Sequence, residues 1–244
     1  MELRTEWLGR IAYRRAWDLQ HELVAARAAG AVPDTLLLLE HPAVLTLGRH
    51  ANPEHVLIPE DELARRGIEV LQVERGGEVT YHGPGQLVAY PIVRLAEGGP
   101  LLRPLVRALE AAMADLAGSY GVVAGRREGF PGCWVNPDGV LPRKLGALGL
   151  RVERGVSYHG IGFNVSTDLA DFALIDPCGL AGLDVTSIAR EAGWTGVDAR
   201  PSTESVREAG ARFAVAFQRR LAEARDTSAQ LVREPAEPLA ATAS

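Results

Sequence analysis

Two side chains in this sequence have the chemistry of a nucleophile and of a base that can give up its proton: Cys178 and Lys144. Cys178 lies in the segment Asp176-Pro177-Cys178-Gly179-Leu180, where a proline and a glycine flank the cysteine and indicate a turn. A thiol becomes nucleophilic where a nearby cation favours the thiolate, and Lys144, His82 or His159 can supply that cation. The sequence therefore favours Cys178 as a nucleophile, although a lone cysteine is more often inert than catalytic.

The second cysteine, Cys133, lies in a different context. Its neighbours Trp134 and Val135 indicate packing in an apolar interior, where cysteine usually behaves as a small hydrophobic residue. The two cysteines do not resemble a disulfide framework, so we expect a cytoplasmic protein.

Lys144 is the only lysine among 26 lysines and arginines. An arginine keeps its proton in a protein, whereas a buried lysine can lose it. A chain that uses arginine everywhere else, including the adjacent Arg143, has a chemical reason to keep an amine at position 144. An arginine-rich composition that spared one lysine by accident is the alternative, and the count alone does not separate the two.

A glycine-rich stretch, Arg75-Gly76-Gly77-Glu78-Val79-Thr80-Tyr81-His82-Gly83-Pro84-Gly85-Gln86, precedes the apolar run 87–93. Glycines at this density let the backbone approach a ligand closely, and a loop held by a strand is a common place for binding groups. The alternative is a tight hairpin with a histidine on the surface.

The triplet Tyr-His-Gly occurs twice, at 81–83 and 158–160. The second copy continues as Ile161-Gly162, so small residues recur at positions 160 and 162 of a predicted strand. Small residues at that spacing lie on one face of a strand and leave a groove that suits a flexible acyl chain.

The elements that must position these residues follow from the hydrophobic pattern. We predict helices over 11–29, 61–66, 103–119, 187–192 and 202–225, and strands over 3–8, 35–40, 44–48, 68–73, 87–93, 144–152 and 156–165, with one or two more within 122–136. Adjacent strands such as 144–152 and 156–165 form hairpins, so we expect an α/β domain with a mixed, largely antiparallel sheet and flanking helices. A single domain over residues 1–226 is expected, with a disordered tail over 227–244 that is rich in Ala, Pro, Glu and Ser.

Composition and motifs exclude several classes of function. The net charge of -5 and the lack of basic runs speak against nucleic-acid binding. No apolar segment is long enough to span a membrane, and the N-terminus lacks a signal peptide. None of the six histidines forms a short-spaced pair with a cysteine, so no metal site is expected. The ATP-binding G-x-x-x-x-G-K-[ST] pattern is missing. Its absence does not exclude nucleotide binding, because the glycine-rich stretch at Arg75 could still hold a phosphate.

Four motifs in the right order resemble the lipoyl(octanoyl) transferase family. They are the glycine-rich stretch 75–86, Lys144-x-x-Ala147-x-Gly149, His159-Gly160 with Asn164, and Pro177-Cys178-Gly179. The match covers about residues 36–187, and the set is far more specific than any one motif.

The resemblance implies a fold shared with biotin and lipoate protein ligases and transfer of an octanoyl group without a cofactor. The donor would be octanoyl-acyl-carrier protein, and the acceptors would be lipoyl domains of 2-oxoacid dehydrogenase complexes and the glycine cleavage H protein. Cys178 would carry the acyl group as a thioester, and Lys144 would lower the pKa of that thiol. The substrate groove would be lined by Arg75, Gly76, Gly77, Glu78, Val79, Thr80, Tyr81, His82, Ala147, Leu148, Gly149, Gly160, Ile161 and Gly162.

Three other functions fit part of the sequence. An ATP-dependent lipoate or biotin ligase would share the fold but would need no catalytic thiol. A cysteine hydrolase would use Cys178 with a histidine and leave the single lysine unexplained. A non-catalytic carrier-binding module would keep the glycine-rich stretch but need neither Lys144 nor Cys178.

Overall fold

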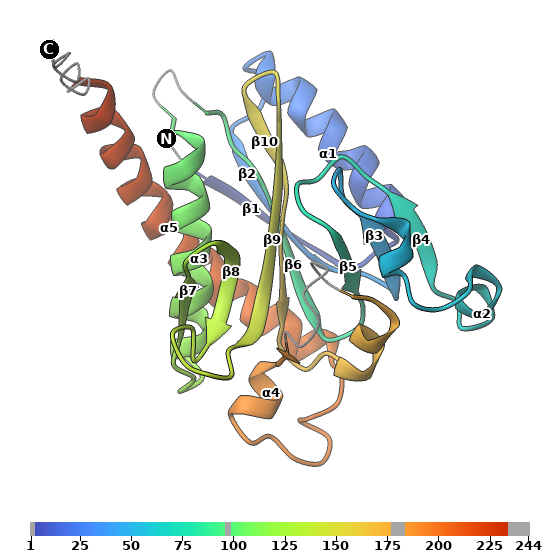
Figure 1. The fold of residues 1–244 in the computed structure, drawn as a ribbon. Coiled ribbons are helices and arrows are strands. Elements are labelled where there is room, and N and C mark those ends of the chain that lie inside the picture. The colour runs from blue at the N-terminus through green and yellow to red at the C-terminus, as the bar shows by residue number, and fades with distance from the viewer. Residues whose placement is uncertain (1–2, 96–98, 177–183, 234–244) are drawn as a thin grey trace, which may run out of the picture.

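The fold is built around one large sheet that is covered by helices on both faces and joined by a smaller sheet (Figure 1). The computed structural model describes residues 3–95, 99–176 and 184–233. The helices are α1 (Tyr13–Ala28), α2 (Glu60–Arg65), α3 (Leu102–Gly118), α4 (Ile188–Glu191) and α5 (Thr203–Arg233), with short 3₁₀ turns at Pro53–His55 and Leu169–Leu174. The strands are β1 (Leu3–Arg10), β2 (Asp34–Glu40), β3 (Val44–Leu47), β4 (Glu69–Gln72), β5 (Val79–His82), β6 (Gln86–Ile92), β7 (Ala124–Arg127), β8 (Phe130–Val135), β9 (Arg143–Glu153), β10 (Val156–Asn164) and β11 (Asp184–Val185).

The large sheet has the strand order β1-β2-β6-β10-β9-β8-β7, and β11 pairs with β9. Among the described strands of this sheet, only the β1–β2 and β9–β11 pairs are parallel. The other neighbours in this sheet run antiparallel, which confirms the predicted fold class. The hairpin predicted between 144–152 and 156–165 is present as β9 and β10, with Arg154 and Gly155 in the turn at positive φ.

The small sheet, in the order β4-β3-β5, was not predicted as a separate unit. Its strand β5 lies inside the glycine-rich stretch and pairs antiparallel with β3. Pairing with β3 satisfies the backbone of residues 79–82, so this segment is a strand although the glycines on both sides of it give the stretch the composition of a loop.

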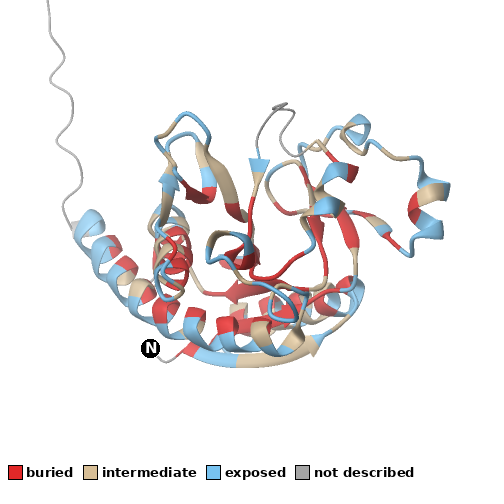
Figure 2. Ribbon diagram, turned by 90° about the horizontal axis from the view of Figure 1, so that it is seen from below, coloured by how far each residue is buried: buried red, intermediate tan, exposed pale blue. Residues whose placement is uncertain are grey.

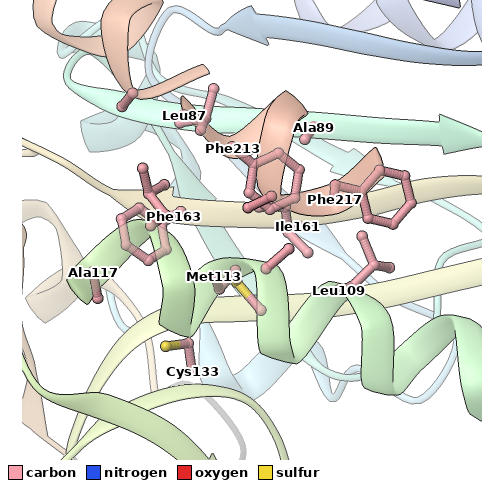
Figure 3. Close-up of a cluster of buried hydrophobic side chains, with 14 of the residues drawn as sticks. Leu87, Ala89, Leu109, Met113, Ala117, Cys133, Ile161, Phe163, Phe213 and Phe217 are labelled. Carbon is pink, nitrogen blue, oxygen red and sulfur yellow. The ribbon is translucent and has the colours of Figure 1, made fainter. Parts of the chain in front are cut away.

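Helices α3 and α5 pack against each other and against one face of the large sheet. Figure 3 shows their contribution to the main core, with Leu109 and Met113 from α3 and Phe213 and Phe217 from α5 lying over Ile161 of β10. Helix α1 covers the opposite face, and its buried residues Tyr13, Ala16, Gln20, Val24 and Arg27 recur at helical spacing. Every residue of β10 is buried, and Figure 2 shows buried residues gathered along the central strands between the helices.

Asp34 at the start of β2 ties three distant segments together. Its buried carboxylate accepts hydrogen bonds from Arg27 Nε of α1 (2.7 Å), from Arg225 Nη2 of α5 (2.6 Å) and from the backbone N–H of Arg94 (3.0 Å). Buried carboxylates are normally paired in this way, and the three contacts hold α1, α5 and the segment after β6 against the start of β2.

Helix α5 continues to Arg233, so residues 227–233, which were predicted to belong to a disordered tail, are helical. Ser228 explains the difference, because it is buried and its hydroxyl donates to Ala224 O and accepts from the backbone N–H of Leu101. Composition indicated an irregular chain, but contacts with the start of α3 favour another two turns of helix. Residues 234–244 lie outside the described part of the chain.

Candidate active site

The glycine-rich stretch forms a loop that is wedged between two strands. The N–H of Gly76 donates to Leu150 O of β9 (3.0 Å), and Gly77 has a φ of 88° that favours glycine. A Cβ on Gly149 would lie 2.6 Å from Gly76 O, and a Cβ on Gly48 would overlap Gly77 O. Glycines at 48 and 149 therefore make room for the loop, which is why its backbone can lie directly against β9.

Arg75 holds this loop to the small sheet. It is largely buried, and its guanidinium donates to both the hydroxyl and the carbonyl oxygen of Thr46 in β3 and to Gly76 O. A planar guanidinium with several donors suits this multiple contact better than a lysine ammonium would.

A pocket of about 550 Å³ lies between the loop, β5, β9, β10 and the start of α3. An adjoining narrow extension of about 40 Å³ shares part of the lining and runs toward α1. The volume of the main part is in the range of pockets that bind small molecules.

Most residues predicted from the sequence lie around this pocket. The main part is lined by Arg75, Gly76, Gly77, Glu78, Val79, Thr80, His82, Lys144, Ala147, Leu148, Gly149 and Gly162. Gly160 and Ile161 line the extension. Tyr81 lines neither, because its ring packs in the core of the small sheet and its hydroxyl donates to Asp171 Oδ2 (2.6 Å). Cys178 lies outside the described residues.

Lys144 reaches the pocket from β9, directly opposite Val185 of β11. Its carbonyl oxygen accepts from the N–H of Thr186 (2.9 Å), so the chain following residue 183 is fixed beside the lysine. Its Nζ lies 4.8 Å from the centre of the Trp134 ring, a contact that attracts an ammonium group.

A chain of buried amides, which the predicted site did not include, connects the pocket wall to this segment. Asn164 Nδ2 donates to Thr186 O (3.0 Å), and its Oδ1 accepts from Gln86 Nε2 (3.0 Å). Gln86 Oε1 then faces His82 Nδ1 at 2.6 Å. Because the carbonyl of Thr186 can only accept, each amide orientation is determined in turn, and Nδ1 of His82 must carry the proton. The signal in the sequence is a polar side chain within an otherwise apolar strand, as at Asn164.

Burial keeps the histidines around the pocket neutral at physiological pH. It lowers the pKa of His82 to about 3 and that of His41 to about 4. The pKa of His159 is also lowered by burial, against the opposing effect of Glu74. These histidines therefore act as hydrogen-bonding and packing groups, and not as the cation that a thiolate would need.

Basic residues outnumber acidic ones around the pocket. Among the described residues, Arg49, Arg75, Lys144 and Arg151 line it together with a single carboxylate, Glu78. The carboxylate of Glu78 faces His55 Nδ1 (3.1 Å) and accepts from the backbone N–H of Asn52 (3.2 Å). The pocket is thus suited to a neutral or anionic ligand, although the whole chain is acidic.

Cys133 is fully buried in the main core beside Met113, as predicted (Figure 3). Burial raises the pKa of its thiol to about 12, and the nearby Glu110 acts in the same direction. A thiol with so high a pKa is a poor nucleophile at neutral pH.

Neither a metal cluster nor a membrane helix is found in the part of the chain that is described. There, no three His, Cys, Asp or Glu side chains are grouped so that they could hold a metal ion. None of the helices over residues 3–95, 99–176 and 184–233 combines the length and apolar character needed to cross a bilayer.

Residues 12–225 match the family described as the lipoyl protein ligase A/B catalytic domain. Among individual proteins, an octanoyltransferase of Chloroflexus aurantiacus is 45% identical over 214 residues, covering 87% of this chain and 95% of the relative. An octanoyltransferase of Acidobacterium capsulatum is 47% identical over 199 residues, covering 78% of this chain and 81% of the relative.

Solved structures show the same fold at low sequence identity. A lipoate protein ligase of Thermoplasma acidophilum superposes with a TM-score of 0.63 at 16% identity, covering 96% of this chain and 93% of the other. A lipoate-protein ligase A bound with ATP also gives a TM-score of 0.63 at 16% identity, with coverage of 96% and 95%. These structures share the fold of the chain, and the more similar octanoyltransferases indicate the reaction.

Proposed function

Because the chain belongs to the lipoyl(octanoyl) transferase family, within the lipoyl protein ligase A/B catalytic domain family, we propose that it takes octanoyl groups from acyl-carrier protein. The chain is an acyltransferase, and its reaction is octanoyl transfer in protein lipoylation. The proposal adds the donor, a thioester on Cys178 and the ε-amine of a lipoyl-domain lysine as the acceptor.

One observation carries the proposal: the single lysine of the chain lines the pocket formed by the glycine-rich loop. An amine at this place can both attract a thiolate and carry a proton, whereas an arginine could only do the first. β11 lies beside Lys144, and Asp184 follows Cys178 by six positions, so at most about 20 Å of extended chain separates Cys178 from Asp184.

In the first step the Cys178 thiolate attacks the carbonyl carbon of the donor thioester. The new carbon–sulfur bond forms as the bond to the carrier sulfur breaks, and the ammonium of Lys144 gives its proton to the departing carrier thiolate. One thioester replaces another, so the step is nearly isoenergetic and needs no ATP.

In the second step the neutral amine of the acceptor lysine attacks the acyl-enzyme. An amide bond forms, the bond to Cys178 breaks, and Lys144, now a neutral amine, takes the proton from the attacking nitrogen. The cysteine returns as thiolate and the lysine as ammonium, which restores the starting state. Amide formation from a thioester is downhill and drives the transfer.

We further propose lipoyl domains of 2-oxoacid dehydrogenase complexes and the glycine cleavage H protein as acceptors. The proposed place of the reaction is the cytoplasm, in line with a sequence that has no disulfide framework.

Intact-mass measurement tests the proposal directly. Purified protein is mixed with octanoyl-acyl-carrier protein without ATP, first alone and then with a lipoyl domain. We expect one octanoyl adduct on the enzyme and its transfer to the domain. A requirement for ATP, or release of free octanoate in place of transfer, would contradict the proposal and favour a ligase or a hydrolase.

A further inference from the structure

The small extension of the pocket has a wall of buried rings from three separate elements. Tyr13 of α1, Tyr90 of β6 and His159 of β10 line it, and each is at most 3% exposed. The main pocket and this extension share the lining residues Ala147 and Gly149, so a ligand that lies along β9 points toward these rings.

The wall is held rigidly by hydrogen bonds. Tyr13 Oη lies 3.4 Å from His159 Nδ1, and Tyr90 Oη lies 2.9 Å from Nε2 of His41. The backbone N–H of His159 donates to Gln20 Oε1 of α1 (2.7 Å). Interiors held in this way do not yield easily to a longer ligand.

His159 also has a strained backbone, with a φ of 54° in the middle of a strand. A residue other than glycine costs energy in this conformation, and such strain is concentrated at functional positions. The imidazole is thus retained at a position where glycine would be favoured by the backbone alone.

The rings that form the wall are neutral, so an apolar chain end can contact them. Burial raises the pKa of Tyr13 to about 12 and that of Tyr90 well above its ordinary value. It lowers the pKa of His159. The hydroxyl groups of Tyr13 and Tyr90 are engaged with His159 and His41, which lowers the cost of placing an apolar group beside these rings.

The route from Lys144 to the rings runs along β9. Gly149, which lines both parts of the pocket, lies five residues beyond Lys144, about 16 Å of extended strand. An acyl chain that begins at the lysine amine therefore extends along β9 toward the rings.

We infer that Tyr13 and His159 form a stop that limits the length of the acyl chain. The inference rests on the proposed function, since it assigns the end of the same acyl pocket. It predicts that removing a ring admits longer chains while the chemistry at Lys144 is unchanged.

His159→Gly is the decisive variant, because it removes the imidazole and suits the backbone conformation at this position. Arg154→Gly is the matched control: Arg154 also has a positive φ, of 50°, but lies in the β9–β10 turn and lines neither part of the pocket. Tyr13→Ala removes the neighbouring ring from a different element. Each protein is tested with octanoyl and dodecanoyl thioesters of the same carrier protein, and kcat/KM is measured for both.

We expect His159→Gly to raise the dodecanoyl-to-octanoyl ratio of kcat/KM by at least about tenfold, the selectivity that a few methylenes provide in an apolar pocket. Tyr13→Ala should change the ratio in the same direction, and Arg154→Gly should leave it at the wild-type value. An unchanged ratio in folded His159→Gly, or an equal change in Arg154→Gly, would overturn the inference.

Calorimetric titration with free octanoate and dodecanoate gives a measurement that does not depend on transfer. We expect His159→Gly to gain affinity for dodecanoate relative to octanoate. If the wild-type protein transferred no octanoyl group but this relative affinity still rose, the proposed function would fail and the stop would remain. If the wild-type protein transferred octanoyl groups but His159→Gly gained no affinity for dodecanoate relative to octanoate, the proposed function would stand and the stop would be refuted.

Discussion

Gly149 of β9 and Gly76 of the glycine-rich loop meet backbone to backbone, with room for no side chain between them. The loop belongs to the small sheet and β9 to the large one, so the pocket lies where the two sheets touch. Its shape depends on that contact, and the contact depends on the absence of a side chain at Gly149.

Gly149→Ala should therefore displace the loop. The new Cβ would stand 2.6 Å from Gly76 O, a backbone atom that cannot move alone. We expect KM for the acyl donor to rise at least tenfold. The midpoint temperature of thermal unfolding should change little, because the substitution displaces the loop and leaves the core packed. Gly118→Ala, in helix α3 with no atom near its Cβ, is the control and should keep wild-type kinetics. Equal KM values for the two variants would show that the loop tolerates the displacement.

Lys144→Arg separates charge from proton transfer. The variant keeps a cation of similar reach but loses the amine that can titrate. We expect acyl transfer to the acceptor lysine to fall by about 10²–10⁴-fold, the usual effect of losing a general acid–base group. Alkylation of Cys178 by iodoacetamide near neutral pH should persist, because an arginine still favours the thiolate. Single-turnover transfer close to the wild-type rate would rule out the proton-transfer role.

The two cysteines should behave differently when they are replaced. Cys178→Ser should form no stable acyl adduct in an intact-mass measurement. Cys133→Ala should retain the adduct and lose only about 1 kcal/mol of stability or slightly more, the cost of a small cavity. Iodoacetamide should leave folded Cys178→Ser unmodified at neutral pH, since burial raises the pKa of Cys133 to about 12. Loss of the adduct in both variants would contradict the assignment of the nucleophile.

The buried histidines make stability depend on pH. Burial lowers the pKa of His41 to about 4 and that of His82 to about 3, whereas an unfolded histidine titrates near 6.5. Below about pH 6.5 the unfolded chain therefore binds protons that the folded chain does not. The free energy of unfolding should fall toward acid pH by up to roughly 1.4 kcal/mol per pH unit for each histidine.

Urea unfolding at pH 7.5 and pH 5 checks this dependence. His41→Asn keeps an N–H donor for Ile11 O and removes the titrating group, so its stability should decline less over this range. His50→Gln, at an exposed position, should decline as the wild type does. The idea fails if wild type and His41→Asn lose the same free energy between the two pH values.

The amide chain offers a test of how the lysine is positioned. Asn164→Asp keeps the size of the side chain but replaces the donor to Thr186 O by a second acceptor. We expect kcat to fall more than tenfold with a smaller change in KM, because β11 would shift beside Lys144 while the glycine-rich loop and the extension keep their place. Asn164→Ser tests whether a smaller donor restores part of kcat. A rise in KM alone would place the role of Asn164 in substrate binding.

Much of the fold was predictable from the sequence because it follows local rules. The continuous apolar runs at 35–40 and 87–93 are buried strands, and the Glu153-Arg154-Gly155 turn forms the expected hairpin. The small sheet was not predictable in this way, since β5 is a strand only through its pairing with β3. The last two turns of α5 were missed because a buried Ser228 favours them, and composition does not reveal a partner as distant as Leu101.

The residues of the candidate site were also predictable only in part. Motifs indicated the glycine-rich loop and Lys144, which line one pocket in the structure. They gave no indication of Tyr13, which is ordinary in the sequence and reaches the pocket only because α1 packs on β10. The placement of Tyr81 in the core likewise depends on the alternation along β5, which the loop-like composition conceals.

The partners of Asp34 have a consequence for the order in which the chain can complete its fold. During synthesis from the N-terminus, β2 leaves the ribosome long before residue 225, and the partner arginine on α5 is among the last described residues to follow. Until then Asp34 has Arg27 close by but lacks the second cation, and burying it early would leave its charge undercompensated. The large sheet should thus close late, with the final helix acting as the step that commits the nascent protein to its native form.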